Sequence, residues 1–151
     1  MNKEPKGMTL IVKTAARLTA GVILMYGIYI ISHGHVSPGG GFAGGVIITL
    51  AFVLVILAFG KEFSMRKVSA SIASSFESFG AIMFLAIALA GFLGGYFFLN
   101  FFINKGVPFT LFSAGIIPLC NIAISLKVGA GLFAVFAVLV MLKFTNGKDK
   151  G

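Results

Sequence analysis

The sequence predicts an all-α integral membrane protein with four transmembrane helices, and two observations lead to that fold class. Of the 151 residues, 58% are hydrophobic and only 11% are charged. The mean hydropathy of +1.05 lies above what a soluble domain of this size could keep in solution. The apolar residues also gather in four stretches, each long enough for the roughly 20 helical residues that cross a hydrocarbon core.

The predicted spans cover about residues 9–32, 42–60, 79–103 and 119–142. The first is interpreted as a retained span, because no small-residue cleavage site precedes the loop that follows it. Lys13 and Arg17 lie four residues apart near its start, so they share one helix face and can extend toward the nearby headgroups. No internal repeat or second domain is found, so residues 1–151 are predicted to form a single four-helix membrane domain.

Basic residues are distributed unequally between the two ends of the spans. The side with the first and third connections has only Lys105, whereas ten of the twelve lysines and arginines fall on the other side: Lys3, Lys6, Lys13, Arg17, Lys61, Arg66, Lys67, Lys143, Lys148 and Lys150. The positive-inside rule then predicts a multi-pass protein of the cell membrane with both termini in the cytoplasm. Within the second connection, Met65, Val68 and Ile72 recur at helical spacing, which predicts a short amphipathic helix on the inner surface.

The formal net charge of +8 would suggest a nucleic-acid partner in a soluble chain. Here the basic residues flank apolar segments, so membrane topology explains them and no nucleic acid is expected. The single cysteine, Cys120, excludes an intrachain disulfide and any cysteine-ligated metal site built by this chain alone, and we expect it to be a small buried hydrophobe. Without a nucleophile and base pair, a metal cluster or a nucleotide cradle, neither catalysis nor a cofactor is predicted.

A glycine-rich stretch between the first two spans is the most distinctive local motif. It reads His33-Gly34-His35-Val36-Ser37-Pro38-Gly39-Gly40-Gly41-Phe42-Ala43-Gly44-Gly45. Pro38 and the three glycines after it end the first helix and expose backbone amides at the start of the second, where anions or carbonyl groups are attracted. The motif is not a nucleotide-binding loop, because no Gly-Lys-Ser/Thr follows and no strand precedes the glycines.

Two interpretations of these glycines are open: close helix packing or direct participation in transport. Packing is favoured by three pairs of small residues four positions apart. These pairs are Gly40 with Gly44, Gly41 with Gly45, and Gly91 with Gly95 in the third span.

His33 and His35 are two residues apart, which puts them on opposite sides of an extended chain. No third ligand of a suitable type lies nearby, and this argues against a metal site. Either histidine could titrate near neutral pH or form a hydrogen bond with a neighbouring subunit at the outer interface.

Lys127 stands near the middle of the last apolar stretch, where a charge needs a reason. Placing a lysine at the bilayer centre costs about 2.5–3.5 kcal/mol on insertion scales, so such residues face a polar cavity, a partner or an ion pathway. Glu77, the one acid near a span, is expected at the inner end of the third helix, about 10 Å or more away in depth. We therefore expect the partner of Lys127 on another subunit, where the lysine either takes part in ion or proton movement or forms a permanent contact.

The segment from Thr14 to Leu18 and the glycine-rich motif resemble the B subunits of the multisubunit Mrp-type sodium/proton antiporters. The same family includes relatives in membrane-bound hydrogenases and related respiratory complexes. The resemblance covers nearly the whole chain, but antiporter members typically carry Phe-Asp-x-Gly-Val where this chain reads Leu126-Lys127-Val128-Gly129-Ala130. This exchange of an acid for a base makes any cation-binding role of the aspartate unsafe to transfer, and it favours the version found in hydrogenase or sulfur-reducing complexes.

The resemblance implies a non-catalytic membrane subunit of a multisubunit sodium/proton antiporter module, which helps to form or scaffold the cation or proton pathway. Its implied partners are other membrane subunits of an antiporter or hydrogenase complex, with the lipid bilayer around them and sodium or protons as the ions. The alternative is a purely structural assembly subunit of a stand-alone antiporter, with no direct ion contact. Four short helices with one buried charge are too few for a complete antiporter, which needs a site and two gated access routes.

Overall fold

A computed structural model describes residues 8–60, 70–100, 103–108, 110 and 113–148. It contains α1 (Leu10–Ser32), α2 (Gly40–Phe59), α4 (Ala70–Phe92) and α5 (Ile117–Lys148). Each of the four helices has a segment long and apolar enough to cross a membrane. The predicted all-α membrane fold is therefore confirmed.

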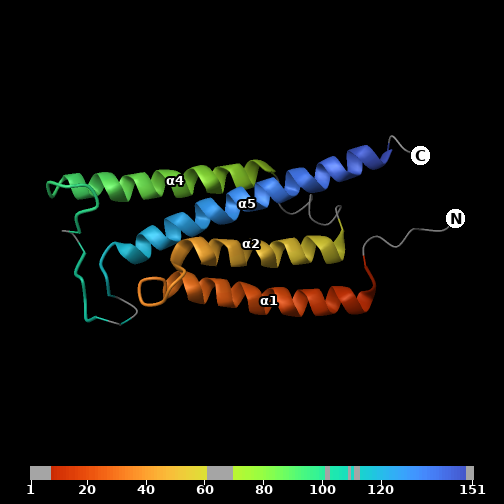
Figure 1. The fold of residues 1–151 in the computed structure, drawn as a ribbon, viewed down its shortest axis with the longest axis horizontal. Coiled ribbons are helices and arrows are strands. Elements are labelled where there is room, and N and C mark those ends of the chain that lie inside the picture. Colours follow the sequence, from red (N-terminus) through yellow and green to blue (C-terminus); the bar gives the residue numbers. More distant parts are fainter. Residues whose placement is uncertain (1–7, 61–69, 101–102, 109, 111–112, 149–151) are drawn as a thin grey trace.

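The four helices lie side by side as one layer in the order α1, α2, α5, α4 (Figure 1). The main contacts join α1 to α2, α2 to α5 and α5 to α4, and α5 runs obliquely between its two neighbours. One end of the layer holds the α1–α2 connection and the segment between α4 and α5, and the other end holds the start of α1 and the end of α2. In the described part of the chain no second layer covers this one, so the helices keep large open faces.

Two glycines of α2 allow close packing against its neighbours α1 and α5. Gly44 packs against α1, where an added methyl group would lie 3.1 Å from the carbonyl oxygen of Gly27. Gly45 packs against α5 in the same way, 2.8 Å from the carbonyl oxygen of Ser125. Successive glycines thus face two different neighbours, and both helices approach α2 at backbone distance.

Thr49 adds a polar contact to the α2–α5 interface. Its buried hydroxyl lies 3.0 Å from the carbonyl oxygen of Gly45 and 2.9 Å from that of Gly129, so its one proton is shared between the two helices. Because the carbonyl oxygen of Gly45 lies in the same helix as Thr49, the hydroxyl group has a hydrogen-bond acceptor without a water molecule.

The third helix lies earlier in the chain than the predicted span 79–103. It begins at Ala70 and ends at Phe92, and the backbone then turns with positive φ at Gly95. The serines near its start are polar, but a helix can satisfy their hydroxyl groups. Ser75 Oγ, for example, donates to the carbonyl oxygen of Ser71 one turn earlier, at 3.0 Å. The prediction was wrong by about two turns at the start because hydropathy alone ignores this local compensation.

The predicted packing pair of Gly91 and Gly95 is also wrong. Gly95 lies beyond the helix with no atom near the position of a Cβ, whereas Gly91 packs under the returning chain, 2.6 Å from the amide nitrogen of Phe98. The glycine through which α4 contacts its neighbour is Gly80, where a methyl group would lie 2.8 Å from both the carbonyl oxygen of Ala123 and the amide nitrogen of Lys127.

The remaining boundaries differ little from those predicted, with α2 starting at Gly40 and α5 starting at Ile117 and continuing to Lys148. Of the predicted amphipathic helix, Met65 and Val68 lie outside the described residues and Ile72 belongs to α4. Cys120 is half-buried in α5.

Lys13 and Arg17 share a helix face and lie over the ring of Phe59, with Lys13 Nζ 5.8 Å and Arg17 Cζ 5.2 Å from its centroid. These cation–π contacts join the start of α1 to the end of α2. The backbone amide of Met8 also donates to the carbonyl oxygen of Ala58 at 3.1 Å, so both contacts hold the same two ends together.

The buried interior is small for four helices. A cluster of Ile56, Ala73 and Phe133 forms the centre, where α2, α4 and α5 meet. In the most apolar 18-residue stretch of α2, only 33% of the residues are buried. In the corresponding stretches of the other three helices, only 17% are buried. Many large apolar side chains of the described helices therefore face outward from the layer.

Candidate functional site

An ion pair joins the two charged residues that lie within the spanning parts of α4 and α5. Lys127 Nζ lies 3.6 Å from Glu77 Oε1. This separation is too long for a good hydrogen bond but close enough for strong electrostatic attraction. The expectation that the two residues lie far apart in depth was wrong, because α4 begins at Ala70 and carries Glu77 two turns into the helix.

Small residues bring the two charges within reach of each other. Gly80 lets α4 approach the backbone of α5 at Lys127 itself. One turn further along α5, the position of a Cβ on Gly131 is 3.8 Å from Glu77 Oε1, so the carboxylate lies beside this glycine. The close crossing of α4 and α5 therefore positions the pair.

The pair is only half covered. The side chains of Lys127 and Glu77 keep 52% and 42% of their surface exposed. Among the described residues, no hydrogen bond to either charged group accompanies the ion pair. Two half-exposed charges inside apolar helices are expected to face a polar cavity or another protein rather than lipid.

Asn121 connects α5 to the glycine-rich motif. The backbone amide of Gly41, at the start of α2, donates to Asn121 Oδ1 at 3.3 Å, and only 8% of Asn121 is exposed. Its Nδ2 is buried without a hydrogen-bond partner in the described part of the chain. The carbonyl group expected at this helix start is thus supplied by the protein itself.

Sequence reasoning did not identify Asn121, although one signal was available. A carboxamide in an apolar span, six residues before Lys127, is unusual enough to mark a buried contact.

The rest of the motif forms the turn between α1 and α2. Gly39 and Gly40 have φ of 124° and 57°, in the region that favours glycine, directly after Pro38. The backbone of Gly34 is packed against the backbone of Gly40, which leaves no room for a side chain. The geometry accounts for these glycines through the turn and the packing.

The two histidines contact different parts of the chain. The ring of His33 stacks on that of Tyr29 at 4.1 Å between centroids, and its Nδ1 donates to the carbonyl oxygen of the same residue at 3.2 Å. His35 Nε2 donates to the carbonyl oxygen of Thr110 at 3.0 Å, which ties the first connection to the third. Within the ranges that the structure describes, no three metal-ligating side chains come together.

A cavity of about 290 Å³ lies beside His35 and Lys105, between the α1–α2 connection and the segment that joins α4 to α5. His35 Nδ1 is buried there without a hydrogen-bond partner among the described residues.

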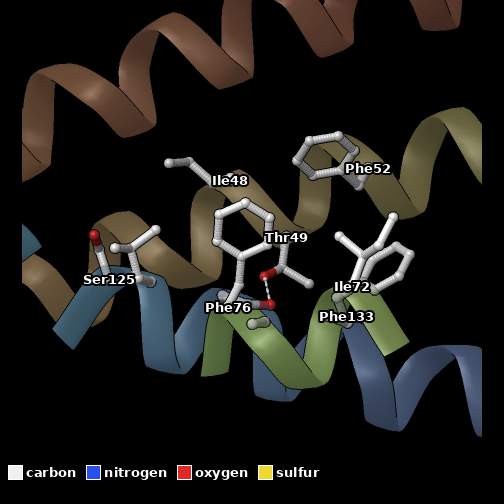
Figure 2. Close-up of a pocket in the computed structure, with 11 residues that line it drawn as sticks. Ile48, Thr49, Phe52, Ile72, Phe76, Ser125 and Phe133 are labelled. Atoms are coloured by element: carbon white, nitrogen blue, oxygen red, sulfur yellow. Dashed lines mark hydrogen bonds between the residues drawn. The ribbon is translucent and has the colours of Figure 1, made fainter. Parts of the chain in front are cut away.

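An apolar groove of about 330 Å³ runs between α2 and α4, with α5 as its floor (Figure 2). The two hydroxyl groups in the lining both donate to backbone carbonyl oxygens. Thr49 Oγ1 donates to those of Gly45 and Gly129, and Ser125 Oγ donates to that of Ile122 at 2.8 Å. The lining residues are Ile48, Thr49, Phe52, Ile72, Ala73, Phe76, Ser125, Leu126, Gly129, Ala130 and Phe133. Neither Lys127 nor Glu77 belongs to this lining, so the groove and the ion pair are separate features.

Comparison with known proteins gives a family match and two similar relatives. The family described as domains related to the MnhB subunit of Na⁺/H⁺ antiporters matches residues 11–134. The proposed antiporter subunit mnhB2 of Staphylococcus aureus is 30% identical over 141 residues, covering 92% of this chain and 96% of that protein. An uncharacterized protein of Methanocaldococcus jannaschii is 39% identical over 130 residues, covering 82% of this chain.

A similar solved structure is that of the membrane-bound sulfane sulfur reductase (MBS), an archaeal respiratory membrane complex. The match has a TM-score of 0.76 and 30% identity, and it covers 92% of this chain and 60% of the MBS chain. The chain spans about half of its M. jannaschii relative, at 49%, and nearly all of the S. aureus one.

Proposed function

Because the chain belongs to the family of domains related to the MnhB subunit of Na⁺/H⁺ antiporters, we propose that it is a non-catalytic membrane subunit of a multisubunit sodium/proton antiporter module. In this role it helps to form or scaffold the cation or proton pathway, within a respiratory complex of the membrane-bound hydrogenase or sulfur-reducing type. The similarity to the MBS chain supports this setting. The partners are other membrane subunits, and the ions are sodium or protons.

The half-exposed pair of Lys127 and Glu77 carries the proposal. A subunit surrounded by lipid alone would hold two charges against hydrocarbon, which is unfavourable. A subunit that borders a polar pathway or another protein would avoid this unfavourable contact between the charges and hydrocarbon. The thin layer of helices and its largely exposed apolar faces support assembly with other subunits.

A second function is favoured by a specific observation. The pair is made within one chain, so each charge already has its counter-charge and need not contact a moving ion. In that case the chain is a structural assembly subunit of a stand-alone antiporter, with no ion contact of its own.

Substitutions in the native complex separate the two functions. Lys127→Arg keeps the charge but makes deprotonation unavailable, whereas Lys127→Met removes the charge and leaves Glu77 unpaired. Lys105→Met removes a lysine from the connection between α4 and α5 and serves as the control. Assembly is measured by copurification of the other subunits, and ion coupling by sodium-dependent proton movement in inverted vesicles.

If the pair borders the pathway, both Lys127 variants assemble and both lose coupling. If the pair is structural, Lys127→Arg assembles and couples normally while Lys127→Met fails to assemble. Normal assembly and coupling in both variants would remove the pair from either function.

We further propose that both termini lie in the cytoplasm. Lys13 and Arg17 lie at the end of the layer where α1 starts, and the positive-inside rule supports a cytoplasmic location for that end.

A further inference from the structure

We infer that the open face of α4 and α5 around Glu77 and Lys127, here called the charged face, is where a transmembrane helix of another subunit packs. We further infer that this helix presents an uncharged hydrogen-bonding side chain, such as Ser, Thr, Asn or Gln, at the depth of the pair. The inference rests on the proposed function, because it requires that the chain assembles with other membrane subunits.

The pair has unused hydrogen-bonding capacity. An ammonium group has three donors and a carboxylate has about four acceptor sites. The contact between the two groups is 3.6 Å long, and about half of each side chain is open. Acyl chains offer neither donors nor acceptors, so lipid cannot satisfy these groups.

The charged face and the apolar groove lie on different sides of the layer. A helix turns about 100° per residue, which places Lys127 roughly 130° around α5 from the middle of the arc formed by Ser125, Leu126, Gly129, Ala130 and Phe133. A molecule in the groove therefore does not cover the pair. Whatever contacts Lys127 and Glu77 must approach from the other side.

Charge complementarity selects an uncharged partner. Lys127 and Glu77 together carry no net charge, so a partner with a full charge would leave one charge uncompensated in the membrane. A neutral side chain that both donates and accepts can bond the ammonium and the carboxylate at once. Gly131, directly beside the carboxylate, adds no side chain of its own that would cover the pair.

Photo-crosslinking in the purified native complex tests this assignment. A benzophenone amino acid replaces Val138, which is 54% exposed and lies three turns from Lys127 on the same side of α5. The matched control replaces Phe76, an aromatic residue of the groove with 52% exposed surface. We expect Val138 to crosslink to a transmembrane helix of a different subunit and Phe76 to give at least several-fold less of that product.

Peptide mapping of the Val138 product then identifies the partner helix. We expect Ser, Thr, Asn or Gln about three turns from the crosslink, toward the start of α5. Crosslinks to lipid alone or to a second copy of the chain would overturn the inference, as would an Asp, Glu, Lys or Arg in place of the neutral residue. Absence of the chain from any complex would instead defeat the proposed function, so the two failures are distinguishable.

Two neutral double substitutions test the hydrogen bonds themselves. Glu77→Gln with Lys127→Gln keeps hydrogen-bonding groups, so the yield of the Val138 crosslink should stay within about twofold of the unsubstituted pair. Glu77→Leu with Lys127→Leu is equally neutral but offers no hydrogen bonds, and the yield should fall several-fold. Equal yields from the two double variants would show that the contact does not need a polar partner, contrary to the inference.

Discussion

Substituting Gly41 with alanine should separate α2 from α5, and the structure gives the size of the effect. The added methyl group would lie 2.8 Å from Asn121 Cα and 2.9 Å from its carbonyl carbon, with the carbonyl oxygen closer still. Ordinary contacts of this kind begin at 3.4 Å, so the α5 backbone must move by at least half an ångström. Backbone atoms cannot rotate away as a flexible side chain can.

The expected cost has two parts. Overpacking at a tight contact costs about 1–3 kcal/mol, and loss of the bond from the Gly41 amide to Asn121 Oδ1 costs about 0.5–1.5 kcal/mol more. Together these give about 1.5–4.5 kcal/mol. For a chain of this length, each kcal/mol lowers the melting temperature by about 2–4 °C, so we expect a fall of roughly 3–18 °C.

Gly21→Ala is the matched control. It makes the same chemical change in a helix, but no atom lies within 4 Å of the new methyl group. Its effect should be neutral or stabilising by up to about 1 kcal/mol, because alanine favours the helix. Both variants are heated in detergent, and the folded fraction is measured by size-exclusion chromatography of a fluorescent fusion. Equal melting temperatures for the two variants would refute the argument that backbone contact at Gly41 holds α2 to α5.

Three further predictions concern two other contacts and the orientation in the membrane. Thr49→Val should lower stability by about 1 kcal/mol through loss of the hydroxyl shared with Gly129, whereas Thr49→Ser should retain most of it, as thermal melting of the two variants would reveal. His35→Ala should release the third connection from the first, so the hydrogen-bonded backbone amides of Thr110, Ser113 and Ala114 should exchange hydrogen faster, with His33→Ala as a control that leaves the Thr110 contact intact. In a Cys120→Ser background, cysteines placed at Ser37 and Lys105 should react with an impermeant thiol reagent from outside the cell, and labelling solely from the cytoplasm would reverse the proposed orientation.

The sequence was sufficient to predict the family and the four apolar helices that the described residues form, because both depend on long or specific patterns. Four apolar stretches and the glycine-rich motif are such patterns. The ion pair between Lys127 and Glu77 was missed because its prediction depended on where the third helix begins. Moving the start of the third helix from residue 79 to Ala70 changed the depth of Glu77 enough to bring its carboxylate to Lys127.

The contact of Asn121 with Gly41 could not be predicted for a different reason. These residues are 80 positions apart, and no local pattern specifies which helix supplies the carbonyl group for the start of α2. The same is true of the Thr49–Gly129 bond. Such contacts depend on which helices become neighbours, and hydropathy does not contain that information.

The glycine contacts of α2 also control how the chain can assemble after insertion. Helices that insert separately and then associate could slide past one another in the membrane, since lipid gives little preference for one axial alignment. A slip of one turn along α2 would bring Thr49 to the place of Gly45, where even a methyl group would meet the backbone of Ser125. The chain between Ser37 and Gly40 is a turn and cannot extend the helix in the other direction. A single alignment of α2 with α5 therefore remains, and since α5 carries Lys127, the same glycines fix the height in the membrane at which the charged face meets its neighbours.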